Sequence, residues 1–153
     1  MRITIVAVGR MRRGPERDLY EHYAGRITTW RLEQIEVGVR ARLSRGELRA
    51  AEGEALIRAL PSEAHVVALD RGGDTVDSEA FARLLARWHE AGVRDLAFVI
   101  GGAEGLAATV LTRAGKTLSL GPMTWPHLLA RGMLAEQVYR AQQILAGHPY
   151  HRG

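Results

Sequence analysis

Two glycine- and proline-rich segments in the second half of the chain hold the residues best suited to bind a small molecule. Gly101 and Gly102 begin the first segment, and residues 120–126 (Leu-Gly-Pro-Met-Thr-Trp-Pro) form the second. Such segments offer backbone N–H and C=O groups rather than charged side chains. That chemistry suits the adenine and methionine parts of a nearly neutral cofactor better than a pyrophosphate. A pair of tight structural turns is the alternative that these segments alone leave open.

The glycine spacing does not match the common nucleotide-binding motifs. A dinucleotide site requires G-x-G-x-x-G after a strand, and a P-loop requires Lys and then Ser or Thr after its last glycine. After its first apolar run the chain has only Gly9 and Gly14, and Gly14 is followed by Pro15. The sequence therefore disfavours NAD and ATP as ligands.

The side chains give little support for a metal site or for a catalytic nucleophile. The chain has no cysteine, which excludes disulfides, thiolate zinc sites and a cysteine nucleophile. His148 and His151 have a spacing that can bind metal, but no carboxylate stands near them in the sequence. No serine lies in a G-x-S-x-G context. We therefore expect neither a metal nor serine hydrolase activity.

Predicted strands and helices alternate along the chain, and they would position these residues. Apolar runs predict strands, and apolar residues at helical spacing predict helices. Ser44, followed by Glu47, and Ser78 are the expected N-caps of two helices. The order indicates a single α/β domain over residues 1–153 with a mainly parallel sheet, whose ligands would bind after residues 69, 100 and 120. The strands are expected over residues 2–8, 32–37, 65–69, 96–100 and 117–120, and the helices over 16–27, 44–60, 78–91, 107–114 and 127–146.

Composition and charge are typical of a globular protein with a polyanionic partner. The chain has 153 residues, 46% hydrophobic, and a formal net charge of +4. The first residues lack the order of a secretory signal, and no apolar run is long enough to span a membrane, so we expect a cytoplasmic location. The arginines of two basic segments are candidates for an RNA-facing surface, and the alternative is that they are solvated loop charges without a function. These arginines are Arg10, Arg12, Arg13, Arg40, Arg42 and Arg45.

The expected C-terminal helix carries more apolar surface than one sheet needs. One stripe contains Leu134 and Val138, and an adjacent stripe begins with Met133 and ends with Ile144. Such a wide face is typical of a subunit interface and equally of a deeply buried helix. A homodimer through this helix is one of these two interpretations.

Several motifs together resemble the RlmH family of large-subunit ribosomal RNA pseudouridine methyltransferases. The resemblance rests on residues 3–9 (ITIVAVG), 100–106 (IGGAEGL), 118–127 (LSLGPMTWPH), 135–141 (AEQVYRA) and 148–152 (HPYHR). It extends over essentially the whole chain. Two positions depart from the family pattern, because Gly121 stands where serine is frequent and Ala103 where proline is frequent.

The resemblance implies a SPOUT-type α/β fold with a deep trefoil knot near the C-terminus, an obligate homodimer and S-adenosyl-L-methionine as methyl donor. The implied reaction is methylation of N3 of a pseudouridine in 23S ribosomal RNA within the ribosome. Cofactor-binding positions carry over onto Leu69, Gly101, Gly102, Leu120, Gly121, Pro122, Met123, Thr124, Trp125 and Pro126.

The same resemblance implies that the C-terminal residues Tyr150, His151 and Arg152 act on the acceptor side as catalytic residues. Tyr can stack on a base, and Arg can hold a phosphate or a developing anion. The group that accepts the N3 proton is left open among His127, His148, His151 and Glu104. Two other functions remain open: a ribosome- or RNA-binding protein of the same fold without catalysis, and a different α/β nucleotide-binding enzyme.

Overall fold

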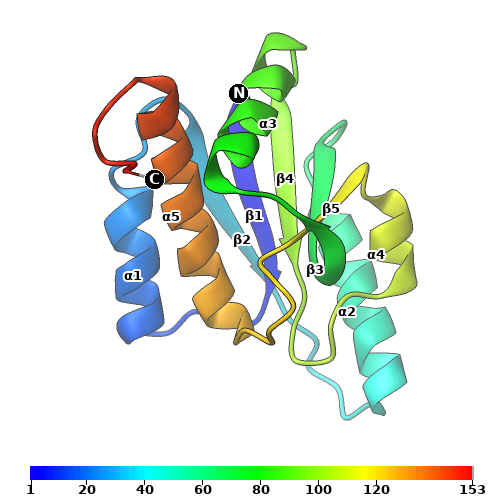
Figure 1. The fold of residues 1–153 in the computed structure, drawn as a ribbon. Coiled ribbons are helices and arrows are strands. Elements are labelled where there is room, and N and C mark those ends of the chain that lie inside the picture. Colours follow the sequence, from blue (N-terminus) through cyan, green and yellow to red (C-terminus); the bar gives the residue numbers. More distant parts are fainter. Residues whose placement is uncertain (153) are drawn as a thin grey trace.

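A five-stranded parallel sheet forms the centre of the molecule (Figure 1), as the computed structural model of residues 1–152 describes it. The strand order is β2-β1-β4-β3-β5, and every pairing is parallel. The α/β prediction is therefore confirmed. The strands are β1 (Arg2–Val8), β2 (Arg31–Val37), β3 (His65–Thr75), β4 (Asp95–Ile100) and β5 (Lys116–Ser119), and the helices are α1 (Pro15–Ala24), α2 (Arg45–Ala59), α3 (Ser78–Glu90), α4 (Ala108–Arg113) and α5 (His127–Leu145).

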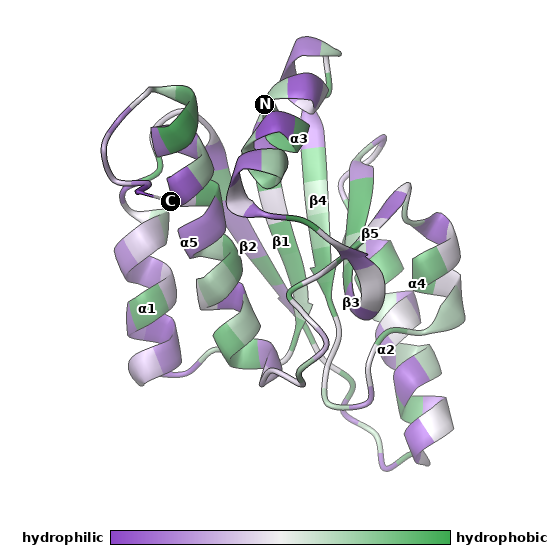
Figure 2. Ribbon diagram, viewed as in Figure 1, coloured by the Kyte–Doolittle hydropathy of each residue, from purple (hydrophilic) through white to green (hydrophobic). Residues whose placement is uncertain are grey.

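Helices cover both faces of the sheet, which explains why the central strands are apolar on both sides. Alternate residues of β1 face opposite layers: Ile3 and Ile5 pack with α3 and α5, whereas Val6 and Val8 pack with α2 and α4. Figure 2 shows this as nearly continuous hydrophobic colour along β1 and β4, in contrast to the two-coloured helices. Because both layers are filled, ligand sites are left to the ends of the strands.

Helix α2 begins where its sequence predicts. The Ser44 side chain accepts a hydrogen bond from Glu47 N at 3.3 Å and donates one to Glu47 Oε1 at 2.7 Å. The predicted cap of α3 was wrong by one residue, because Asp77 Oδ1 accepts from Ala80 N at 2.7 Å. Ser78 instead donates to Gln137 on α5 at 2.8 Å. The hydroxyl thereby ties α3 to α5.

Strand β3 is longer than predicted. The sequence Asp-Arg-Gly-Gly-Asp at residues 70–74 predicted a turn, but the strand continues to Thr75. Its register with β5 shifts between Leu69 and Asp74, as in a β-bulge. Gly73 is required here, since a Cβ would lie 2.8 Å from the backbone of Leu118. The extension brings residues 70–74 alongside β5 and toward the segment that follows it.

Helix α5 packs tightly against α1 and the sheet. A Cβ at Gly132 would lie 2.7 Å from Leu19 Cδ2 of α1, so the glycine sets this close approach. Leu134 and Val138 are buried against the sheet, whereas Met133 and Ile144, the two ends of the adjacent stripe, are only half-buried. One stripe of α5 thus belongs to the core, and the adjacent stripe is not fully covered.

Candidate functional site

A cavity of about 710 Å³ opens at the carboxyl ends of β4 and β5, beside residues 69–71 of β3. Its size is typical of a small-molecule site. Gly101 and Leu120 directly follow β4 and β5, Leu69 lies within β3 where its register with β5 shifts, and all three line the cavity. Nine of the ten sequence-predicted cofactor positions contribute to its wall; the tenth, Pro122, lies within the same loop. The geometry gathers the predicted residues at one place, and their binding role stays a prediction.

Hydrogen bonds hold the segment 120–126 in a defined shape. Ser119 Oγ, 8% exposed, accepts from Gly121 N at 3.1 Å and lies 3.2 Å from the carbonyl oxygen of Arg71. The Arg71 guanidinium donates to Thr124 Oγ1 at 3.1 Å, and the indole of Trp125 donates to the Leu120 carbonyl at 3.2 Å. Gly121 has φ 108°, a backbone conformation that favours glycine. The loop is therefore largely preorganised.

The glycine segment after β4 forms the facing wall. Gly105 N donates to the Gly102 carbonyl at 3.1 Å, which closes a tight turn. A Cβ at Gly101 would lie 2.8 Å from the backbone of Gly105, so only glycine fits there. Behind Gly102 stands Glu52 of α2, whose carboxylate oxygens would lie 3.2 and 3.3 Å from a Cβ added to that glycine.

His127 begins α5 and lines the same cavity. Burial lowers the pKa of His127, and the positive charge of Arg131 lowers it further. The imidazole is thereby biased toward its neutral form, which can accept a proton. Its Nε2 lies 3.3 Å from the position of a Cβ on Gly9, so it also borders the loop after β1.

Arg131 is a fully buried cation that the sequence analysis did not identify. Its guanidinium donates to the carbonyls of Val8 and Gly9 at 2.7 and 2.6 Å and to Glu36 at 2.8 Å. Glu36 in turn accepts from Met11 N. One side chain of α5 therefore fixes the carboxyl end of β1 and the loop that follows it, one helical turn from His127.

The C-terminal residues lie along α5 and not among the residues that line this cavity. The Tyr150 hydroxyl donates to Glu136 at 3.1 Å, and Arg140 stacks on the Tyr150 ring at 4.9 Å. His151 Nδ1 lies 3.2 Å from the Arg140 guanidinium, whereas Arg152 is exposed. Burial raises the pKa of Tyr150, with hydrogen bonding to Tyr23 and the charge of Glu136 acting in the same direction.

A second cavity, of about 670 Å³, lies beside the tail. Glu136 and Tyr23 line it, and it shares Leu69, Leu120 and Gly121 with the first cavity. The two cavities therefore meet between Leu69 of β3 and the residues that follow β5. Of the candidate proton acceptors, His127 and Glu104 line the first cavity. His148 and His151 belong to the tail and line neither.

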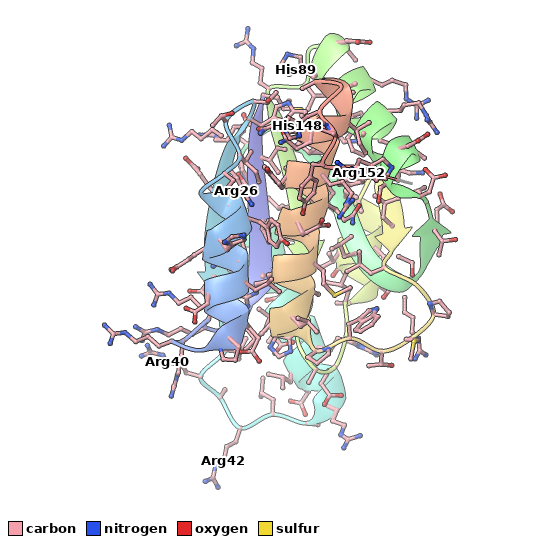
Figure 3. All side chains as sticks on the ribbon, turned by 60° about the vertical axis from the view of Figure 1, so that its left-hand side comes forward. Arg26, Arg40, Arg42, His89, His148 and Arg152 are labelled. Atoms are coloured by element: carbon pink, nitrogen blue, oxygen red, sulfur yellow. The ribbon has the colours of Figure 1, made fainter. Side chains whose placement is uncertain are left out.

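The six arginines of the two basic segments are all exposed. Figure 3 shows Arg40 and Arg42 projecting from the loop between β2 and α2, at the opposite end of the molecule from His148. Arg45 approaches Glu104 at 3.8 Å, which links this basic edge to the cavity.

Within residues 1–152, no cluster of three or more His, Asp or Glu side chains has metal-binding geometry. No helix in the described part of the chain is long and apolar enough to cross a membrane.

The open parallel sheet, with a ligand-sized cavity at the carboxyl ends of β4 and β5, is typical of α/β proteins that bind a small molecule. A family model described as predicted SPOUT methyltransferase matches residues 1–151. The chain therefore belongs to the SPOUT methyltransferase family, and the fold prediction is confirmed at that level.

Curated relatives match over nearly their entire length. The chain is 57% identical over 152 residues to a protein of Rhodospirillum centenum named ribosomal RNA large subunit methyltransferase H, with 99% of each chain covered. It is 55% identical over 148 residues to the protein of the same name in Gluconacetobacter diazotrophicus, covering 97% of this chain and 95% of the relative. The resemblance to this family drawn from the motifs is confirmed.

A solved structure supports the fold independently. A probable methyltransferase from Bordetella pertussis Tohama I superposes with a TM-score of 0.54 at 17% identity, covering 92% of this chain and 95% of the other. At this identity the likeness establishes the architecture alone.

Proposed function

We propose that this chain transfers the methyl group of S-adenosyl-L-methionine to N3 of a pseudouridine in 23S ribosomal RNA, on the assembled ribosome. The proposal rests on relatives named ribosomal RNA large subunit methyltransferase H, which are 57% and 55% identical to this chain over nearly its whole length. The pseudouridine acceptor comes from the family resemblance of the motifs. A homodimer in the cytoplasm is part of the same proposal, as is a trefoil knot.

The cavity fits the proposed cofactor in size and chemistry. The segments 101–105 and 120–126 line it, and their backbone groups can bind an adenine edge and a methionine chain without a phosphate site. Asp70 and Glu104 place carboxylates at the same cavity, which suits a ligand with cationic groups. When bound, the cofactor supplies an electrophilic methyl group on a sulfonium, which departs as a neutral thioether.

We assign proton removal from N3 to His127 in this proposal. His127 lines the cavity, and its lowered pKa favours the neutral imidazole that a base needs. Glu104 is the alternative, and its carboxylate has the Arg45 guanidinium at 3.8 Å. In this role the imidazole would accept the N3–H proton, which would leave the N3 electron pair free to take the methyl group that the bound cofactor would supply. Positioning of the two reactants contributes the larger part of the rate, of the order of 7–11 kcal/mol.

The exposed arginines support an RNA substrate. They lie in the loops that follow β1 and β2 and at the start of α2, on the same edge of the sheet as the cavity. Arginine is suited to phosphate contacts, and such contacts make binding depend on salt. The tail residues Tyr150, His151 and Arg152 keep their proposed acceptor-side role, at the second cavity.

Mass-spectrometric mapping of methylated 23S ribosomal RNA tests the proposal. Purified protein and cofactor are added to ribosomes that lack the modification, and to free 23S RNA as the parallel substrate. We expect one new methyl group, on a pseudouridine, in ribosomes. RNA binding without any methyl transfer or cofactor binding would instead favour a non-catalytic ribosome-binding protein.

A further inference from the structure

One buried carboxylate near the cavity has no role in the function described so far. Glu52 of α2 is 8% exposed, and its Oε2 atom has no hydrogen-bond partner among the described residues. Leaving a buried charge unpaired is costly, so such groups are rare without a functional reason. Burial raises the pKa of Glu52, and the charge of Glu104 raises it further.

The packing directs this carboxylate at the cavity wall. Both Glu52 oxygens lie within 3.3 Å of the position that a Cβ on Gly102 would take, and Val8 Cγ1 lies at 3.0 Å. Gly102 is itself a lining residue, so a single glycine separates the carboxylate from the cavity. The adjacent Gly53 has a matching constraint, because a Cβ there would lie 2.7 Å from Ala107 Cβ. α2 is thereby held close enough to bring Glu52 to this wall.

The other charged groups at the cavity are exposed or already paired. Glu104 has Arg45 at 3.8 Å, Asp70 accepts from Gly72 N at 2.8 Å, and Arg71 donates to Thr124. Water screens exposed charges strongly, whereas a buried charge acts over several ångströms with little screening. Glu52 therefore dominates the fixed negative field behind the glycine segment.

We propose that Glu52 makes the cavity selective for a sulfonium ligand over the neutral thioether of the same shape. The inference rests on the proposed function, in which S-adenosylmethionine binds and S-adenosylhomocysteine leaves. A sulfonium has no N–H or O–H to donate, so the protein can recognise its charge only through electrostatic attraction. Methyl transfer removes that charge, and the attraction that held the donor disappears for the product. Glu52 thus favours donor binding and product release.

Calorimetric titration of both ligands against the wild type and Glu52→Gln tests this proposal. We expect Glu52→Gln to weaken S-adenosylmethionine binding about tenfold at mildly alkaline pH and to change S-adenosylhomocysteine binding less than about twofold. The wild-type preference should persist at high salt, because the charge is buried. Glu52→Asp, which keeps the charge, should retain part of the preference. Glu54→Gln, an exposed glutamate on the same helix, is the matched control and should change neither affinity.

Thermal unfolding of the ligand-free proteins separates this role from a structural one. Because Glu52 is unpaired and is repelled by Glu104, Glu52→Gln should raise the Tm slightly. A lower Tm, with equal loss of both ligands, would assign Glu52 to the structure of the loop and overturn the proposal. An unchanged ratio of the two affinities would overturn it as well. A wild-type protein that binds neither ligand would instead refute the proposed function, and this inference with it.

Discussion

At the scale of single residues, the site depends on glycines that allow backbone and carboxylate to approach each other. Gly102→Ala would insert a methyl group 3.0 Å from Val8 and about as close to Glu52. We expect at least a tenfold loss of cofactor affinity, measured by calorimetry, because the segment must shift away from the cavity. Gly46→Ala is the control, since nothing lies within 4 Å of its Cβ position in α2. It should leave binding unchanged and raise stability by ~0.5–1 kcal/mol. A Gly102→Ala protein with normal affinity would show that the wall is not rigid.

His127 is the second residue-scale test. If it accepts the N3 proton, His127→Gln should lower the methylation rate by roughly 10²–10⁴-fold while cofactor affinity stays the same. Because the pKa of His127 lies below its ordinary value of about 6.5 and the neutral form is the active one, the wild-type rate should hold down to a pH below about 6.5 and fall at more acidic pH as the imidazole becomes protonated. Single-turnover rates across pH measure both effects. A His127→Gln rate close to that of the wild type would transfer the role to Glu104.

At the scale of elements, Arg131 connects α5 to the carboxyl end of β1. Breaking a buried charge pair is costly, so Arg131→Met should lower the free energy of unfolding by about 3–5 kcal/mol. Urea denaturation provides the measurement. Arg17→Met removes an exposed arginine from a pair with Glu21 and should cost less than about 1 kcal/mol. Equal effects of the two substitutions would mean that Arg131 contributes no more than a surface charge.

The elements were largely predictable, whereas the contacts between distant ones were not. Apolar runs indicated the strands, since helices cover both faces of the central sheet, and apolar residues at helical spacing indicated the helices. The run 70–74 was misread because its glycines and aspartates are typical of a turn, while pairing with β5 keeps it extended. Arg131 joins Glu36 across 95 positions, which no local spacing reveals. One hint of the buried position of Glu52 is present in the sequence. Its neighbour Gly53 lies inside a helix, where a glycine can indicate close packing.

At the scale of the whole molecule, the half-covered stripe of α5 supports the predicted dimer. Met133 begins that stripe and lines the second cavity, next to α1. Met133→Glu should convert a dimer into a monomer in sedimentation experiments, because it places a charge in the proposed interface. Arg58→Glu, on the exposed face of α2, should leave the mass unchanged. A wild-type protein that sediments as a monomer would contradict the dimer.

The fold places the cavity lined by residues 101–105 and 120–126, the neighbouring cavity beside the tail, and the basic segments around one parallel sheet. Transfer of a labelled methyl group from S-adenosylmethionine to ribosomes lacking this modification tests the central claim most directly, with matched ribosomes that carry uridine in place of pseudouridine. The account predicts incorporation only when the pseudouridine is present. Equal incorporation into both kinds of ribosome, or none into either, would contradict it.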